Sequence, residues 1–400
     1  MSFVHLVEPQ PAPGPWPILA LGFRPFFLLA AIFAAAAAPF WLLIYQGVVE
    51  PVSYLPPTIW HAHEMVFGFA VAVVAGFLLT AASNWTGRRT ATGLGLAALV
   101  SLWLAGRGLI AAGGALPVAL VVAVDVAFLP ILATTLAVPI LAAGNRRNIV
   151  FPIVLLVLGA LNLAIHLGAL GRIEWDPSRT LRVAIDLILL MIGVLGGRVI
   201  PSFTKNALPQ ARVNPCSKAG VLALLSLTAV AVSDAATGDP AITGAVALAA
   251  GLINLLRMRG WGSLATVRTP ILWILHVGYG WLAIGLILRG VGGLTEIIAE
   301  DAGIHALTLG AIGSMTIGMM SRVALGHTGR SIIAVPLLVA AYWLVNGAAV
   351  LRVLFAIVAT DGLRMASLFG SGLLWSLAFL AFAIIYLPIL SRPRADGRPG

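Results

Sequence analysis

Histidine is the residue type through which this sequence could do metal chemistry. Six of its seven histidines lie in or beside long apolar segments, namely His61, His63, His166, His276, His305 and His327. Polar side chains at membrane depth are costly, so each one is a candidate for function. Neutral imidazole is the commonest metal ligand and suits copper, zinc and haem iron. The histidines therefore predict a metal site within the apolar segments.

The densest group of such residues covers positions 60–65, with the sequence WHAHEM. On a regular helix His61 and His63 point about 200° apart, so they face different neighbours unless the helix start is unwound. His61 and Glu64 are three residues apart and share a face. Glu64 could orient His61 as a hydrogen-bond acceptor, or carry protons for the site.

Cysteine contributes little to this chemistry. Cys216 is the only one in the sequence. A single cysteine excludes an intramolecular disulfide, a Cys₄ zinc site and a cysteine-ligated iron–sulfur cluster. It also lacks the Cys-x-x-Cys-His context of c-type haem attachment, so a haem here would be of the b type.

The elements that position the histidines are predicted to be membrane-spanning helices. The chain has 400 residues, of which 60% are hydrophobic and 10% charged, against about 25% charged in soluble domains. Continuous apolar runs of about 20 residues predict helices and exclude a barrel. Twelve such runs predict an all-α polytopic membrane protein: 26–46, 59–82, 92–113, 117–142, 149–169, 181–202, 219–236, 241–256, 270–289, 303–325, 333–357 and 367–390.

The positions of the basic residues predict the orientation. The net charge is +10. In a membrane protein such an excess of basic residues indicates the orientation of the spans more than it indicates nucleic-acid binding, and we expect no nucleic-acid partner. Lys and Arg gather in the loops after even-numbered spans and at the C-terminus, which places both termini in the cytoplasm. Residues 1–25 and 391–400 are then cytoplasmic segments flanking one membrane domain, 26–390, and we expect no cleaved signal peptide.

This topology sorts the histidines by depth. His61, His63, His166 and His305 fall near the outer face, whereas His276 lies about a third of the way up from the cytoplasmic side. The other buried charges, among them Arg107, Asp125 and Asp186, are expected to pair across helices. Arg172 and Arg179, near the outer ends of spans 5 and 6, either hold haem propionates or are ordinary loop charges.

A weak internal repeat relates spans 2, 6 and 10 and is compatible with three units of four helices. Span 2 matches span 10 at a shift of 242 residues, and span 6 matches span 10 at a shift of 124. The matched residues include His63 with His305, Gly68 with Gly310, Gly76 with Gly318, Met191 with Met315 and Arg198 with Arg322.

Several motifs together resemble the NnrS family of haem- and copper-containing bacterial membrane proteins. They are GFRPFF at 22–27, WHAHEM at 60–65, NWTG at 84–87, GRVIP at 197–201, His305-Ala306, and MSRV at 320–323 followed by GHTGR at 326–330. The resemblance covers essentially the whole chain. It implies an inner-membrane protein of the nitric oxide response that carries haem and copper and protects against nitrosative stress, as in denitrification.

The architecture is also similar, by analogy only, to the catalytic subunit of haem–copper oxidases, which has twelve spans in three arcs. There the copper ligands lie on spans 6 and 7, and this chain has no histidine on either. Fold-level analogy does not establish function.

The resulting hypothesis is a metalloprotein that binds nitric oxide and, as a redox enzyme, could reduce it. Haem is expected on His63 and His305, with Arg172 and Arg179 near its propionates. Copper is expected on His61, His166 and His276, with His63 and His305 also available as metal ligands. Glu64 would exchange protons with the site. Electrons would come from quinol or a redox protein.

The alternative from another class is a proton-coupled secondary transporter that uses buried His, Glu, Asp and Arg. A metal sensor and a haem-handling protein also remain open.

Overall fold

Every regular element in the described part of the chain is a helix. The computed structural model describes residues 16–50, 53–295, 297–358 and 361–398. Within these ranges twelve helices are long and apolar enough to cross a membrane, which confirms the predicted fold class. The N-terminal segment predicted over 1–25 is described only from residue 16.

The spans are formed by the following elements: α1 (Phe23–Tyr45), α2 (Pro57–His63) continuing through η2 (Glu64–Ala70) into α3 (Val71–Thr86), α4 (Gly93–Ala111), α5 (Val118–Ala142), α6 (Val150–Ala169), α7 (Pro177–Ala207), α8 (Ser217–Ala236), α9 (Pro240–Arg257), α10 (Pro270–Leu294), α11 (Glu300–His305) continuing through η6 (Ala306–Gly313) into α12 (Ser314–His327), α13 (Pro336–Val358) and α14 (Asp361–Leu390).

Local sequence signals fix several helix ends. Asp176 and Asp239 accept hydrogen bonds from backbone N–H groups in the first turns of α7 and α9, and each is followed by a proline at the first helical position. Both features suit a helix start, because the carboxylate satisfies unpaired N–H groups and proline has no N–H to leave unpaired. Gly87 ends α3 with φ +64°, a left-handed conformation that glycine adopts without strain.

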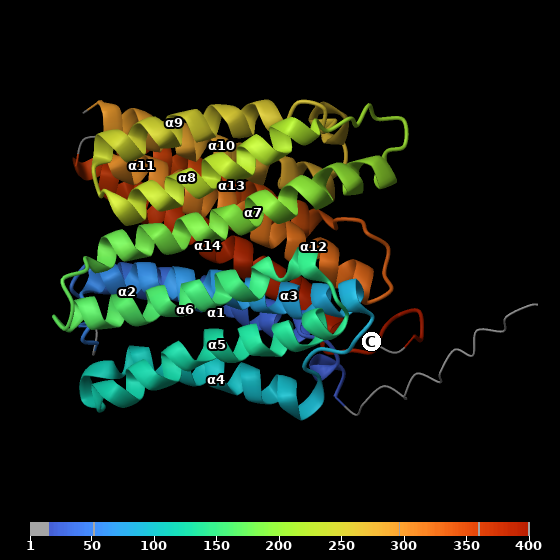
Figure 1. Cartoon of the computed structure of the whole chain (residues 1–400), viewed down its shortest axis with the longest axis horizontal. Coiled ribbons are helices and arrows are strands. Elements are labelled where there is room, and N and C mark those ends of the chain that lie inside the picture. Colours follow the sequence, from blue (N-terminus) through green and yellow to red (C-terminus); the bar gives the residue numbers. More distant parts are fainter. Residues whose placement is uncertain (1–15, 51–52, 296, 359–360, 399–400) are drawn as a thin grey trace, which may run out of the picture.

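The helices run side by side along the long axis of the molecule, and the loops gather at its two ends (Figure 1). We call these the α2 end, where spans 2 and 10 begin, and the C-terminal end. Neighbours in sequence pack together, and α14 packs on both α13 and α1. The α2–α3 rod and the α11–α12 rod are the most buried spans. In their most apolar 18-residue stretches, 78% and 72% of the residues are buried. These two rods form the core of the bundle.

The two central rods share an unusual backbone feature. Each contains a π-helix, η2 over Glu64–Ala70 and η6 over Ala306–Gly313. The shift of 242 residues places Glu64 on Ala306, so the π-helices begin at equivalent positions, immediately after His63 and His305. This coincidence supports the internal repeat between spans 2 and 10. π-helical segments are rare and occur mostly at functional sites.

Candidate metal centre

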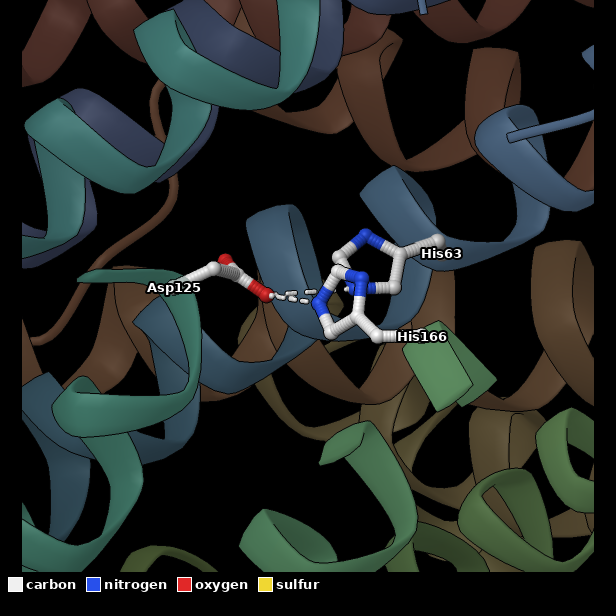
Figure 2. A group of neighbouring side chains, drawn as sticks. All are labelled: His63, Asp125 and His166. Carbon is white, nitrogen blue, oxygen red and sulfur yellow. Dashed lines mark hydrogen bonds and ion pairs between the residues drawn. The ribbon is translucent and has the colours of Figure 1, made fainter. Parts of the chain in front are cut away.

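Three buried side chains from three spans converge near the α2 end (Figure 2). His63 ends α2, Asp125 lies on α5 and His166 lies on α6. Their ligand atoms all lie within 4.8 Å of one another. Asp125 Oδ2 is 3.3 Å from His63 Nε2 and 3.0 Å from His166 Nε2. One carboxylate oxygen therefore faces the Nε2 atoms of both imidazoles.

These separations fit a metal ion. A tetrahedral ion with ligand bonds of 2.0–2.1 Å keeps its ligand atoms about 3.3 Å apart. Asp125 Oδ2 is already close to that spacing from each of the two Nε2 atoms. Two imidazoles and one carboxylate leave a fourth position open, which is the arrangement of catalytic metal sites. In the absence of a metal the same spacing is that of hydrogen bonds.

The remaining ring nitrogens are held by polar partners. His63 Nδ1 is 3.0 Å from Glu64 Oε1, and His166 Nδ1 is 2.6 Å from the Tyr54 hydroxyl. Metal-binding histidines nearly always donate their second ring N–H to a partner that fixes the ring and its tautomer. Burial and the nearby Asp125 raise the pKa of Tyr54, which keeps its hydroxyl protonated.

His63 has more hydrogen-bond acceptors around it than a neutral imidazole can satisfy. Its Nδ1 faces Glu64, while its Nε2 faces both Asn162 Oδ1, at 2.8 Å, and Asp125. A neutral ring has one N–H. With that N–H on Nδ1, the Nε2 lone pair would face two oxygens, and with it on Nε2, the Nδ1 lone pair would face Glu64. A second proton on the ring, or a metal ion on Nε2, removes this mismatch.

The charge balance also favours a cation. Arg107 pairs with both Glu64 and Asp125, and Asn162 Nδ2 donates to Asp125 Oδ2 over 2.8 Å. Two carboxylates against one guanidinium leave a net charge of −1 in a buried site when both histidines are neutral. An uncompensated buried charge is costly. A metal cation or a protonated imidazole removes this cost.

The other two histidines at the α2 end form a separate pair. The His61 ring stacks on Trp41, with centroids 4.5 Å apart. His305 Nδ1 is 2.7 Å from the Asp301 carbonyl oxygen. His61 and His305 interact electrostatically with each other and with Arg352. The structure thus brings His63 to His166 and leaves His61 and His305 outside this centre.

The remaining predicted residues lie elsewhere. His276 is at the C-terminal end of the bundle, where its ring nitrogens are 2.9 Å from the hydroxyls of Thr204 and Ser263. Arg179 donates to the carbonyl oxygens of residues 234 and 235 at the end of α8. Arg172 is exposed after α6.

Some of the polar network was expected from the sequence and some was not. Arg107, Asp125 and Asp186 do pair across helices as expected, Arg107 with Asp125 and Asp186 with Arg289, a partner that was not predicted. Glu64 was expected beside His61, but its carboxylate contacts His63 and Arg107, while the His61 ring stacks on Trp41. Asp125, Asn162 and Tyr54 were not predicted as site residues. Asp125 and Asn162 carried a signal, since both are polar residues inside apolar spans.

Comparison with known proteins bears on this arrangement. A search among curated proteins gives no match. Residues 17–394, nearly the whole chain, match the NnrS protein family. This range includes both central rods and every residue of the His63–Asp125–His166 centre. The chain belongs to the NnrS family.

Proposed function

We propose that this protein is a membrane metalloprotein of the nitric oxide response, which binds nitric oxide at the centre formed by His63, Asp125 and His166. The observation that carries the proposal is the convergence of two imidazoles and a carboxylate whose second ring nitrogens already have partners. Family membership supports nitric oxide as the ligand. With the orientation that the loop charges predict, the site would lie near the outer face of the bacterial inner membrane.

Copper fits this centre. Imidazole nitrogens suit copper, and the carboxylate adds a negative charge. Copper, when bound, supplies an open coordination position and one-electron chemistry. His63 and His166 would hold it through Nε2, and Asp125 would neutralise part of its charge. Glu64 would accept from the Nδ1–H of His63 and so keep Nε2 of that ring free, and the Tyr54 hydroxyl could accept from the Nδ1–H of His166 once its Nε2 holds the metal, while Arg107 fixes both carboxylates.

A b-type haem would be held by His305 together with a histidine of span 2. His305 has its Nδ1 fixed by a backbone carbonyl, which leaves Nε2 as the ligand atom. The sequence pairs it with His63 through the repeat. His61 is the other candidate on span 2, because His63 already lies with Asp125 and His166. Arg172 remains the candidate for a propionate, because the guanidinium of Arg179 donates to backbone carbonyls.

Reduction of nitric oxide at this site is the further step of the proposal. Two molecules of nitric oxide, two electrons and two protons give nitrous oxide and water. The electrons would come from quinol or a redox protein. Glu64 is buried, with its Oε1 3.0 Å from His63 Nδ1, so it is placed to exchange a proton with that ring.

The test is the optical spectrum of the purified protein, oxidised, reduced, and reduced in the presence of nitric oxide. A Soret band that shifts on reduction and again with nitric oxide supports the haem, and a copper-dependent spectral change on addition of nitric oxide supports binding at the His63 centre. His63→Ala should abolish the copper-dependent changes, while His276→Ala should leave them intact. A featureless spectrum from folded, metal-replete protein would contradict the proposal. Substrate uptake by metal-free proteoliposomes would favour the transporter instead.

A further inference from the structure

An apolar cavity lies among the spans that carry the internal repeat. Its volume is about 70 Å³, and it is bordered by α3, α7 and the η6–α12 segment. The lining includes Ala70 and Val74 of span 2, Met191 of α7, and Met315 and Thr316 of α12. The cavity is separate from the His63 centre, whose ligands do not line it.

The packing of α7 on the central rods leaves room for this space. Helix α7 contacts the two rods mainly at η2 and η6 and makes few contacts with α3 and α12. Three apolar helices that diverge below a common contact leave a gap between their side chains. Two residues of the lining, Ala70 and Gly196, are small.

The chemistry of the lining excludes stable hydration. Thr316 is the one lining residue with a hydroxyl, and that hydroxyl donates to the Gly313 carbonyl over 2.9 Å. A buried water needs two to four polar partners, and apolar cavities without them stay dry. An engineered apolar cavity of about 150 Å³ binds benzene or xenon. At about half that volume, this one suits a molecule of two or three heavy atoms.

We propose that this cavity binds a small apolar molecule of the size of nitric oxide or dioxygen, and holds it beneath the metal centre. Ala70 follows Glu64 by six residues, which is about 9 Å along a helix. A molecule that dissolves in the bilayer would enter from the hydrocarbon side and reach the centre without crossing water. Nitric oxide as the natural occupant rests on the proposed function, but the affinity for an apolar gas does not.

Xenon tests the affinity directly, because it needs no metal. Crystals of the full chain pressurised with xenon should show an anomalous peak between Val74, Met191 and Met315. Val74→Phe should fill the space and abolish the peak. Val194→Phe is the matched control on α7, half-buried but outside the lining, and should keep it. No xenon peak in the wild type, or density for water or an acyl chain there, overturns the proposal.

A second measurement separates this proposal from the proposed function. In metal-loaded protein, flash photolysis of bound nitric oxide should give fast rebinding from the cavity. Val74→Phe should reduce the fraction that rebinds fast severalfold without changing the spectrum. An unchanged fraction overturns the cavity as a reservoir. A xenon peak in protein that binds no nitric oxide supports the cavity and contradicts only the proposed function.

Discussion

Tyr54→Phe removes one hydroxyl and should affect metal binding more than it affects the stability of the bundle. The Tyr54 oxygen is 2.6 Å from His166 Nδ1. Without metal, His166 Nε2–H donates to Asp125, and Nδ1 accepts from the tyrosine. With a metal on Nε2, Nδ1 carries the proton and donates a hydrogen bond to the tyrosine oxygen. The hydroxyl can serve both states because it both donates and accepts.

The expected magnitudes follow from these two roles. Loss of a neutral side-chain hydrogen bond costs about 1 kcal/mol of stability. Loss of a partner that orients a metal-bound histidine lowers metal affinity by about 10- to 100-fold, or about 1.4–2.8 kcal/mol. Tyr54→Phe should therefore weaken copper binding more than it lowers the free energy of unfolding.

The assay is competition with a copper chelator, with thermal unfolding measured on the same preparations. Tyr279→Phe is the control, because its hydroxyl is buried and bonds Asn254 over 2.7 Å in a different network. The control should lose stability and keep its copper affinity. A Tyr54→Phe protein whose copper affinity stays within twofold of the wild type would refute the assigned role of His166.

Three more predictions concern other parts of the bundle. Arg107→Met leaves two buried carboxylates without their cation, so the free energy of unfolding should fall by about 3–5 kcal/mol; an unchanged melting temperature would contradict this. Gly310→Ala would place a Cβ 2.5 Å from the Trp281 ring and should destabilise by about 1–3 kcal/mol, whereas Gly280→Ala meets open space and should not destabilise, as thermal unfolding would reveal. His276→Ala should keep the full copper content by elemental analysis, because its ring lies at the opposite end of the bundle; a loss of copper would contradict the assigned centre.

The spans were predictable from the sequence because a helix that crosses a bilayer needs a long apolar segment, which soluble proteins seldom contain. The ends of the spans were predicted less accurately. The structure begins the second span at Pro57 and the sixth at Pro177, both slightly before the predicted ends, because proline starts a helix without loss of a hydrogen bond. The confinement of four histidines to one end followed from the same topology.

The partners of those histidines were not predictable in the same way. Hydropathy does not say which helices touch, so nothing in the sequence joined His63 to Asp125 and His166. Helical spacing gave His61 as the partner of Glu64, whereas the structure gives His63, because Glu64 also pairs with Arg107 from another span, which the spacing does not reveal. Tyr54 precedes the span and gave no signal.

The most direct test of the central claim is anomalous diffraction at the copper absorption edge from crystals of the copper-loaded protein. The account predicts a peak between His63, Asp125 and His166, about 2.0–2.1 Å from the two Nε2 atoms. The same experiment on His166→Ala should lose that peak. A copper peak at His61 and His305 alone, or none in folded, copper-loaded protein, would contradict the account.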